Sequence, residues 1–422
     1  MHLILKNAQI IDPEGKYHQQ QADILIQNGV IQKIGKVEAG ADDKQVDTTA
    51  CVVMPGAIDI NTFAGEPGYE EKETLETLRA AAQQGGFSEL CTRSDLLPAV
   101  DHSGQASYLK KQSTGSAVEL LPIGSISKGL KGESLSEMYD MHLAGAVAFG
   151  DAKKAITNLQ LISLAMQYVK SFGGKLIFFA DEPTLTKGGQ MHEGEVSIHL
   201  GMKGVPAIAE EMAVRRILEL AEYNQSEVIL FGISTKEAIE AIRIAKEKRL
   251  KVKAGTFVHH LYFTDEALRS FDSNFKLHPP LRSDQHRNAL INGIKSGVID
   301  FLSADHCPEN IEHKQVEFDY AAHGMIGLES ALSASWTVLR KHIGMEQFVK
   351  LWSFNSRSML GLPASHIEEG APAKITLFAP DQVYEFGRQH RKSLSNNSAY
   401  YGQKFTGKVM GTIGGGEWHL AS

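Results

Sequence analysis

The chain has 422 residues, of which 42% are hydrophobic and 22% are charged, and its formal net charge is −7. This length suits one large α/β domain with a smaller companion, and the composition is ordinary for a globular protein. The acidic balance argues against nucleic acid or an anionic membrane surface as the main partner.

The three cysteines, Cys51, Cys91 and Cys307, lie far apart and form no C-x-x-C pair. This usage predicts the reducing cytoplasm as the location and no structural zinc knuckle. The opening stretch MHLILKNAQIIDPEG has no basic segment followed by a long apolar one, so we expect no signal peptide. The apolar runs have the length of buried strands, and we expect no membrane span.

Both ends of the chain show the alternating pattern of β-strands. Strands are expected at residues 3–12, 22–35, 44–56, 373–380 and 404–420. Asn28-Gly29 indicates a hairpin turn between two of them. We predict that residues 1–55 and 365–422 pair with each other as one small β-sandwich domain.

Residues 56–364 change to short apolar strands that alternate with amphipathic helices. Strands are expected at 57–61, 88–93, 118–124, 146–151, 175–181, 227–234, 251–257 and 299–305, with helices at 72–85, 157–173, 207–224 and 235–249. Eight strands in this rhythm favour a (β/α)8 barrel of the TIM type, an α/β fold, with an open doubly wound sheet as the alternative. Functional side chains of such a barrel project from the C-terminal ends of its strands.

Nine segments spread over nearly the whole chain match one enzyme family in order. They are MPGAID…EPG, RAAAQQGGF, GAVAFGD, MHEGEVS, GMKGVPAIAEEMAV, STKEAI, VHHL, PPLRSDQHRNALINGIKSGVIDFLSADHCP and GMIGLE. The chain therefore resembles the dihydroorotases of the amidohydrolase superfamily, close to the bacterial type I enzymes, and is also similar to allantoinases and hydantoinases. The resemblance implies the same barrel, a β-domain built from both chain ends, and a place in pyrimidine biosynthesis.

The resemblance also implies a metal-dependent mechanism. In the family, two divalent metals, usually zinc, are held by a His-x-His after the first barrel strand, by a bridging carboxylate and by histidines after strands five and six. The metals acidify a water molecule and polarise the amide carbonyl. An Asp after strand eight accepts the proton of the water and returns it to the leaving nitrogen.

The family's histidine positions hold other residues in this sequence. Asn61 and Phe63 occupy the His-x-His, and Phe179 and Gly232 occupy the two later positions. Asn61 could offer one weak neutral oxygen, whereas phenylalanine and glycine offer no side-chain donor. If Phe63 and Phe179 turn inward, we expect them to plug the former metal cavity, with about 1.5–3 kcal/mol from the burial of each.

Two acids of the family site remain. Asp151 stands at the bridging position, and Asp305 stands at the position of the ligand and general base. Two carboxylates without an imidazole make a poor zinc site, since zinc favours nitrogen and sulfur donors. We therefore expect no cofactor, or at most a weak or mononuclear metal site, and a vestigial Asp305.

The positions that contact substrate in the family are altered as well. Gly65 replaces an Arg that grips the substrate carboxylate, and Ser94 lies in a TRSD run that replaces Met-Pro-Asn-Thr. His278 and Glu309 stand where the family has Asn and His. Arg93, on a neighbouring strand end, is a candidate replacement for the lost Arg.

Four other histidines are interpreted as structural. The family carries the pair His259-His260 without using it as primary metal ligands, so we expect it to pack in the core or behind the site. His306 follows Asp305 and should point away from the barrel axis by alternation. His192 belongs to a helix start and is expected to make a structural contact.

Three functions are compatible with the sequence. We favour an inactive dihydroorotase homologue that forms a homo-oligomer or acts as an assembly partner of aspartate carbamoyltransferase, an arrangement that the resemblance implies for some bacteria. The alternative is an active dihydroorotase or related cyclic-amide hydrolase, interconverting dihydroorotate and N-carbamoyl-aspartate, with an atypical site built from Asp151, Asp305 and His278. The third is a small-molecule sensor that uses the emptied pocket.

Overall fold

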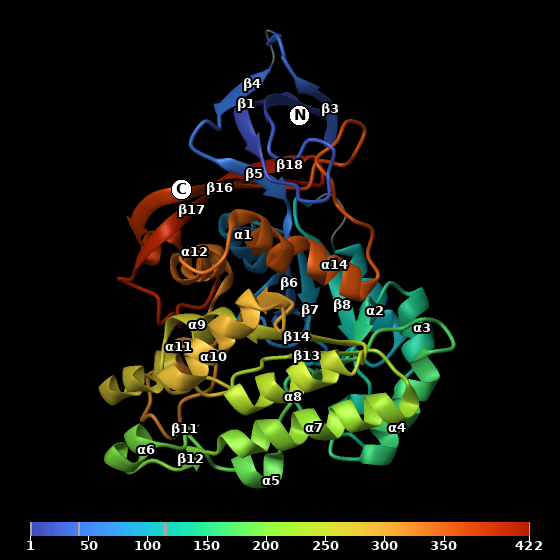
Figure 1. Cartoon of the computed structure of the whole chain (residues 1–422), viewed down its shortest axis with the longest axis vertical. Helices are drawn as coiled ribbons and strands as arrows, with labels where there is room; N and C mark the ends of the chain where they lie inside the picture. Colours follow the sequence, from blue (N-terminus) through green and yellow to red (C-terminus); the bar gives the residue numbers. More distant parts are fainter. Residues whose placement is uncertain (1, 41–42, 113–115, 422) are drawn as a thin grey trace.

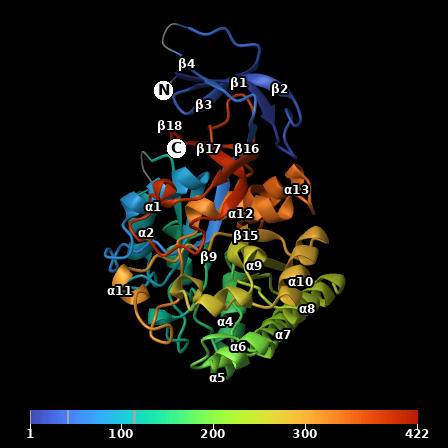
Figure 2. The same cartoon turned by 90° about the vertical axis from the view of Figure 1, so that its left-hand side faces the viewer.

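The structure is a computed structural model that describes residues 2–40, 43–112 and 116–421. Figure 1 shows a barrel of strands and helices with a separate β-sheet at one end, and the first residues of the chain lie in that sheet. Figure 2 shows the same two parts after a 90° turn. The chain is thus an α/β barrel with an added β-domain.

Eight parallel strands form the barrel. In order they are β6 (Ala57–Thr62), β7 (Phe87–Thr92), β8 (Glu119–Gly124), β9 (Ala148–Phe149), β10 (Ile177–Phe179), β13 (Val228–Phe231), β14 (Val252–Phe257) and β15 (Phe301–Ser303). A parallel bridge between Phe149 and Leu176 joins the two four-stranded runs. The Phe63 amide donates a 3.0 Å hydrogen bond to the His306 carbonyl, which closes the ring. The predicted (β/α)8 barrel is confirmed, and the open sheet is excluded.

Helices cover the outside of the barrel (Figures 1 and 2). Thr74 and Thr235 begin two of them, because each side chain accepts a hydrogen bond from an amide in the first turn. Among the residues that the structure describes, no helix is both long and apolar enough to cross a membrane. The helices are α1 (Leu75–Gly85), α2 (Ser103–Lys111), α3 (Met138–Leu143), α4 (Leu159–Val169), α7 (Ala207–Asn224), α8 (Lys236–Glu247), α10 (Asp284–Lys295) and α12 (Leu328–Leu339).

Shorter elements fill the connections. Four of them follow β10 and form one long excursion beside the mouth of the barrel: α5 (Pro183–Thr186), β11 (Met191–His192), α6 (Glu195–Leu200) and β12 (Gly204–Val205). The others include α9 (Val258–Tyr262), α11 (Ile311–Lys314), α13 (Met345–Val349), a π-helical turn (Lys350–Phe354) and α14 (Asn355–Leu360). The loops that carry the candidate site therefore hold much of the irregular structure.

The two chain ends meet in one eight-stranded sheet. Its order is β18-β17-β16-β5-β1-β2-β3, and β4 pairs with β1. β5 runs antiparallel to β16, with Pro55 opposite Ile375, so segments far apart in sequence become neighbours. The β-domain from both ends is confirmed, while its exact limits, 1–55 and 365–422, stay a prediction. The strands are β1 (His2–Ile10), β2 (Gln21–Gln27), β3 (Val30–Gly35), β4 (Lys44–Asp47), β5 (Val52–Pro55), β16 (Ile375–Glu385), β17 (Lys404–Gly414) and β18 (Glu417–Leu420).

Alternating side chains along the barrel strands divide the core into two parts. In β10, Ile177 and Phe179 belong to the barrel interior, whereas Phe178 joins the layer between strands and helices. β13 repeats the pattern, with Ile229 and Phe231 inside. Because the side-chain period of a strand is two residues, this register places Phe179 inside the barrel at its C-terminal end.

A buried ion-pair network joins the barrel to the β-sheet. Glu89 of β7 accepts hydrogen bonds from Arg357 of α14 and, at 2.7 Å, from Lys374, which directly precedes β16. Glu119 at the start of β8 binds the same Lys374 at 2.7 Å. The side chains of Glu89 and Arg357 are only 3% and 5% exposed. Each charge therefore depends on its partners for compensation.

Replacement of Arg357 by Met should lower the free energy of unfolding by about 3 kcal/mol, because it leaves the buried Glu89 carboxylate with one cation fewer. Arg340 is the matched control, since it is 38% exposed and pairs at 3.5 Å with an Asp381 that is 89% exposed. Arg340→Met should cost less than about 1 kcal/mol. Urea denaturation measures both changes, and equal losses would contradict this account.

Candidate active site

Asp305 lies at the mouth of the barrel, directly after β15, and its side chain is 1% exposed. Its Oδ1 accepts a hydrogen bond from the Asn61 amide Nδ2 at 2.8 Å, and its Oδ2 lies 2.6 Å from Lys153 Nζ. Burial raises the pKa of Asp305, and the Lys153 ammonium opposes that rise. Both carboxylate oxygens are thus engaged by donors of the same chain.

Sequence analysis did not single out Lys153, which lies four residues beyond the end of β9. Its ammonium also donates to the His278 carbonyl at 2.7 Å and lies 4.7 Å from the centroid of the Phe257 ring. Both contacts favour a positive charge. The available signal was its place in a loop that follows a barrel strand, where functional side chains project.

Asp151, the other retained acid, has a different set of partners. Its Oδ1 accepts hydrogen bonds from the amides of Ile126 at 2.8 Å and Ser127 at 2.9 Å, and its Oδ2 accepts one from the Ser127 hydroxyl. Burial raises the pKa of Asp151, while these hydrogen bonds lower it. The carboxylate therefore fastens the loop after β8 to the loop after β9, so the two predicted metal ligands do not share a partner.

Two phenylalanine rings occupy the space that a side chain at position 232 would need. Gly232 has a φ of +71°, and an added Cβ would lie 3.0 Å from the Phe257 ring and 3.1 Å from the Phe179 ring. Phe179 is 4% exposed and packs against Phe231 with ring centroids 5.5 Å apart. Phe179 therefore turns inward, as expected.

Phe63 is buried in a different part of the molecule. Its ring centroid lies 5.6 Å from that of Tyr69 and 5.2 Å from the Arg93 guanidinium carbon. Phe63 joins the large cluster outside the barrel, whereas Phe179 belongs to the barrel interior. The expected joint plug is thus wrong, because Phe63 and Phe179 pack in two separate clusters.

A cavity of about 580 Å³ opens at the mouth. Two of the predicted substrate-pocket residues, His278 and Glu309, line it. Basic groups dominate the rest of its polar lining, which includes Arg93, Lys153, Lys276, Cys307, Asp319 and His323. The cavity therefore suits a small polar molecule more than an apolar one.

The other two predicted pocket residues, Gly65 and Ser94, lie outside this lining in the described part of the chain. An added Cβ at Gly65 would lie 2.2 Å from the Glu73 carbonyl oxygen, so the backbone leaves no room for the family's Arg. The Ser94 hydroxyl donates to the Gly150 carbonyl at 2.6 Å. The structure therefore brings two of the four positions to the cavity.

Arg93 reaches the cavity, as a replacement for the lost Arg would have to do. Its guanidinium forms a two-point contact with Asp95, with Nε 2.9 Å from Oδ1. Its Nη1 lies 3.8 Å from Cys307 Sγ. Because the guanidinium of Arg93 is already bound to the Asp95 carboxylate, Arg93 has little capacity left to bind a second anion.

Burial keeps the imidazoles around the mouth neutral. It lowers the pKa of His278 well below the ordinary 6.5, with the charge of Lys153 adding to the effect, and it lowers the pKa of His323 to about 4. His259 and His260 are fully buried with strongly lowered pKa values. Their ring nitrogens have no hydrogen-bond partner among the described residues. The pair therefore packs as core, as interpreted.

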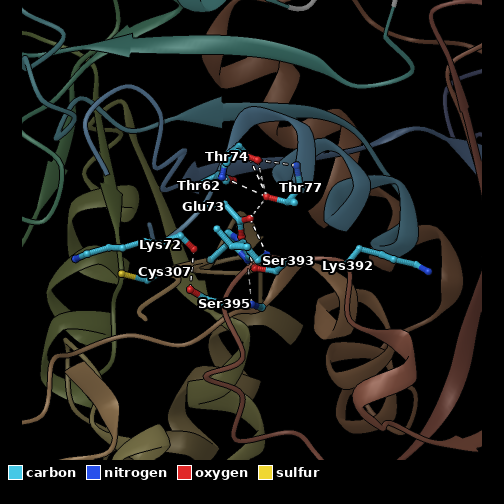
Figure 3. A network of polar contacts seen from close by, with 12 residues as sticks. Thr62, Lys72, Glu73, Thr74, Thr77, Cys307, Lys392, Ser393 and Ser395 are labelled. Carbon is cyan, nitrogen blue, oxygen red and sulfur yellow. Dashed lines mark hydrogen bonds and ion pairs between the residues drawn. The ribbon is translucent and has the colours of Figure 1, made fainter. Parts of the chain in front are cut away.

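Glu73 anchors a buried network beside the mouth (Figure 3). Its Oε2 lies 3.2 Å from His306 Nε2, and its Oε1 accepts a hydrogen bond from the Leu394 amide at 2.9 Å. The hydroxyls of Thr77 and Ser393 also donate to it. The network joins the loop after β6, the loop after β15 and the segment before β17, so His306 has the structural role that alternation predicted.

His192 likewise makes a structural contact. Its Nδ1 lies 3.2 Å from Arg282 Nη1, which also donates to the Val205 carbonyl at 2.8 Å. Burial lowers the pKa of His192 to about 3, and the nearby guanidinium adds to this effect. The neutral ring therefore accepts from Arg282 and holds the excursion after β10 in place.

The residues at the mouth do not fit a pair of zinc ions. Asn61 presents its amide hydrogens and Lys153 its ammonium to Asp305, so donors already face the carboxylate that a metal would need. Within residues 2–40, 43–112 and 116–421, no group of three or more His, Cys, Asp and Glu is arranged to hold a metal. Asp151, Asp305 and His278 do not form such a metal-holding group among these residues.

Comparisons with known proteins identify the family of the chain, although its residues at the barrel mouth differ from the family pattern. The family model described as "Dihydro-orotase-like" matches residues 50–238, and the "Amidohydrolase family" model matches residues 185–419. A dihydroorotase of Ruminiclostridium cellulolyticum is 37% identical over 419 residues, which cover 99% of this chain and 98% of that protein. The chain belongs to the dihydroorotase-like amidohydrolase family. A second dihydroorotase, of Pelotomaculum thermopropionicum, is also 37% identical over 419 residues with the same coverage.

Solved structures resemble this dihydroorotase-like chain in fold. An L-hydantoinase (dihydropyrimidinase) from Arthrobacter aurescens superposes with a TM-score of 0.86 at 20% identity, covering 100% of this chain and 96% of the other. A D-hydantoinase gives a TM-score of 0.83 at 21% identity, with 100% and 95% covered. The barrel and the terminal β-domain are thus those of an amidohydrolase.

Replacement of Gly232 by Ala should destabilise the chain more than an ordinary left-handed glycine would. The positive φ costs about 1–2 kcal/mol, and contact with the Phe179 and Phe257 rings adds about 1–3 kcal/mol. Gly297 is the matched control, because its φ is +77° and no atom lies within 4 Å of an added Cβ. If urea denaturation gives equal losses for Gly232→Ala and Gly297→Ala, the space at position 232 is not filled as described.

Glu73 should make the fold sensitive to acid. Burial by itself raises its pKa, but hydrogen bonds from His306, Ser393 and Thr77 outweigh this, so its pKa lies below the ordinary 4.5. A carboxylate with a depressed pKa contributes stability that is complete above the unfolded pKa and is lost as pH falls through the folded one. Glu73→Gln should therefore lose less stability than the wild type between about pH 5 and about pH 3. Parallel curves of urea midpoint against pH would refute this.

Proposed function

We propose that this chain is a dihydroorotase-family protein of pyrimidine biosynthesis that acts in the cytoplasm as an assembly partner of aspartate carbamoyltransferase and does not hydrolyse cyclic amides. The observation that carries the proposal is the Lys153 ammonium 2.6 Å from Asp305, where the family needs a metal ion and a free base. The family membership supports a role in pyrimidine biosynthesis. The contact between Lys153 and Asp305 supports the proposed loss of catalysis.

The chemistry of ring opening needs two things at this mouth. A metal ion must acidify a water molecule and polarise the carbonyl, and a carboxylate must accept the proton. Asp305 has both oxygens bonded to donors, Asn61 Nδ2 and Lys153 Nζ, so neither oxygen is free to accept the proton of a water molecule. We therefore expect neither the nucleophile nor the base to form.

The retained framework supports a role that depends on shape. The chain matches dihydroorotases along their whole length and keeps the closed barrel, although it has lost the histidines at the ligand positions. Residues that fix packing and residues that perform chemistry are separable on a barrel of this kind. A chain that keeps the residues that fix packing, but not those that perform the chemistry, is suited to an assembly role.

An apolar patch on the outside of the barrel offers a contact surface. Tyr139 and Leu143 are 44% and 68% exposed on α3, and Leu164 and Tyr168 are 45% and 37% exposed on α4. Phe172 joins the two helices, with ring centroids 5.4 Å from Tyr139 and 5.6 Å from Tyr168. Exposed apolar patches can mark protein–protein contacts, and we propose the transferase contact here.

Purified without added zinc, the chain should contain much less than stoichiometric zinc and should hydrolyse dihydroorotate no faster than its Asp305→Ala variant. The Ruminiclostridium cellulolyticum dihydroorotase, purified and assayed in parallel, is the positive control for both measurements. Equimolar zinc together with turnover that Asp305→Ala abolishes would establish the alternative, an active cyclic-amide hydrolase with an atypical site.

The partner is tested by co-purification with the aspartate carbamoyltransferase of the same organism, followed by sizing of the complex. Leu143→Glu should weaken the association, because it places a charge on the exposed apolar surface of α3. Tyr320→Glu is the control, since Tyr320 is 81% exposed and lies beyond α11, far along the chain from the patch. Absence of the complex, with a homo-oligomer in its place, would leave self-assembly as the role.

The cavity favours a second candidate function, the sensing of a small polar metabolite. Its volume of about 580 Å³ and its basic lining provide the space and the charge for an anion. The engagement of Arg93 by Asp95 and of Lys153 by Asp305 argues against strong binding. Thermal-shift measurements with pyrimidine-pathway metabolites distinguish this candidate, which requires a rise in unfolding temperature.

A further inference from the structure

The side chain of Asp305 presents an electrostatic problem that the fold must solve. A carboxylate that is 1% exposed has lost nearly all its hydration, and this costs several kcal/mol unless a cation and hydrogen bonds compensate. In the family this compensation comes with the metals. This chain has no imidazoles at the four ligand positions to bring a metal to Asp305, so the charge must be balanced in another way.

We propose that Lys153 is a built-in replacement for the metal charge: its tethered ammonium occupies the cation position at the barrel mouth and makes folding of the chain independent of zinc. The inference rests on the proposed loss of metal-dependent hydrolysis. It goes beyond that proposal, because it assigns to one residue the positive charge that the metals bring to this position in the family.

The surroundings of Lys153 are those of a complete cation site. Its Nζ lies 2.6 Å from Asp305 Oδ2 and 2.7 Å from the His278 carbonyl oxygen, which uses two of its three N–H donors. The third side faces the Phe257 ring, whose centroid is 4.7 Å away. An anion, a carbonyl and an aromatic face each attract positive charge, and an ammonium satisfies all three.

The carboxylate is also saturated from its other side. Asn61 donates to Oδ1 at 2.8 Å, so the residue at a former ligand position has changed from an acceptor of metal to a donor toward Asp305. A divalent cation could reach Asp305 only by expelling the ammonium and turning the Asn61 amide. The two substitutions therefore act together: one supplies the charge and the other supplies the remaining hydrogen bond.

The test is a double-mutant cycle on stability, measured on the full chain. Lys153→Met removes the charge but keeps an unbranched side chain, and it should lower the unfolding temperature by about 3–6 °C, since breaking a buried pair leaves one charge uncompensated. Asp305→Asn combined with Lys153→Met should recover at least half of that loss, because no uncompensated charge remains. Lys154→Met is the matched control, because Lys154 is the exposed neighbour of Lys153 and should leave the unfolding temperature unchanged.

Two further measurements sharpen the result. Methylammonium chloride, compared with sodium chloride at equal concentration, should raise the unfolding temperature of Lys153→Ala but not of the wild type, because the free amine can replace the missing ammonium. Treatment with EDTA should leave the unfolding temperature of the wild type unchanged. The proposal fails if Lys153→Met behaves like Lys154→Met, if the double variant shows purely additive losses, or if EDTA destabilises the wild type. These outcomes do not depend on whether dihydroorotate is turned over, so this proposal and the proposed function can fail separately.

Discussion

A buried carboxylate needs a cation and hydrogen bonds close to it, and the residues at the mouth of this barrel meet that need for Asp305. Asp305 is held by the Asn61 amide on one oxygen and by the Lys153 ammonium on the other. Phe257 covers the ammonium, and the His278 carbonyl shares it. These contacts leave both oxygens of the Asp305 carboxylate bonded to donors of the same chain.

The phenylalanine rings near Gly232 fill space in the barrel and contribute to its packing. Phe179 enters the barrel interior and, together with Phe257, fills the space above Gly232, so the packing couples positions 179 and 232. Burial of such rings stabilises the barrel, whereas a cluster of imidazoles and carboxylates without a metal would cost free energy. Around these rings, the Glu73 network and the Arg282 contacts hold the surrounding loops in place.

Much of the fold could be predicted from the sequence, because alternation and strand length depend on local patterns. All eight barrel strands and the terminal strands lie in the expected segments. The assignment of Asn61, Phe63, Phe179 and Gly232 to the family's ligand positions rests on the resemblance alone and stays a prediction. The partners of Asp151 and Asp305 could not be predicted, because they depend on how the loops after β8 and β9 fold back. Lys153 is hidden for the same reason: four residues beyond a strand, the period of two no longer tells where a side chain points.

The pairing of β5 with β16 has a consequence for synthesis on the ribosome. β5 is complete once residue 55 has emerged, but its antiparallel neighbour begins only at Ile375. During most of translation one edge of β5 therefore offers unpaired amides and carbonyls, which invite association with other extended chains. The edge stays unpaired until β16 is made, and a truncation before β16 would leave the barrel attached to a sheet with an exposed edge.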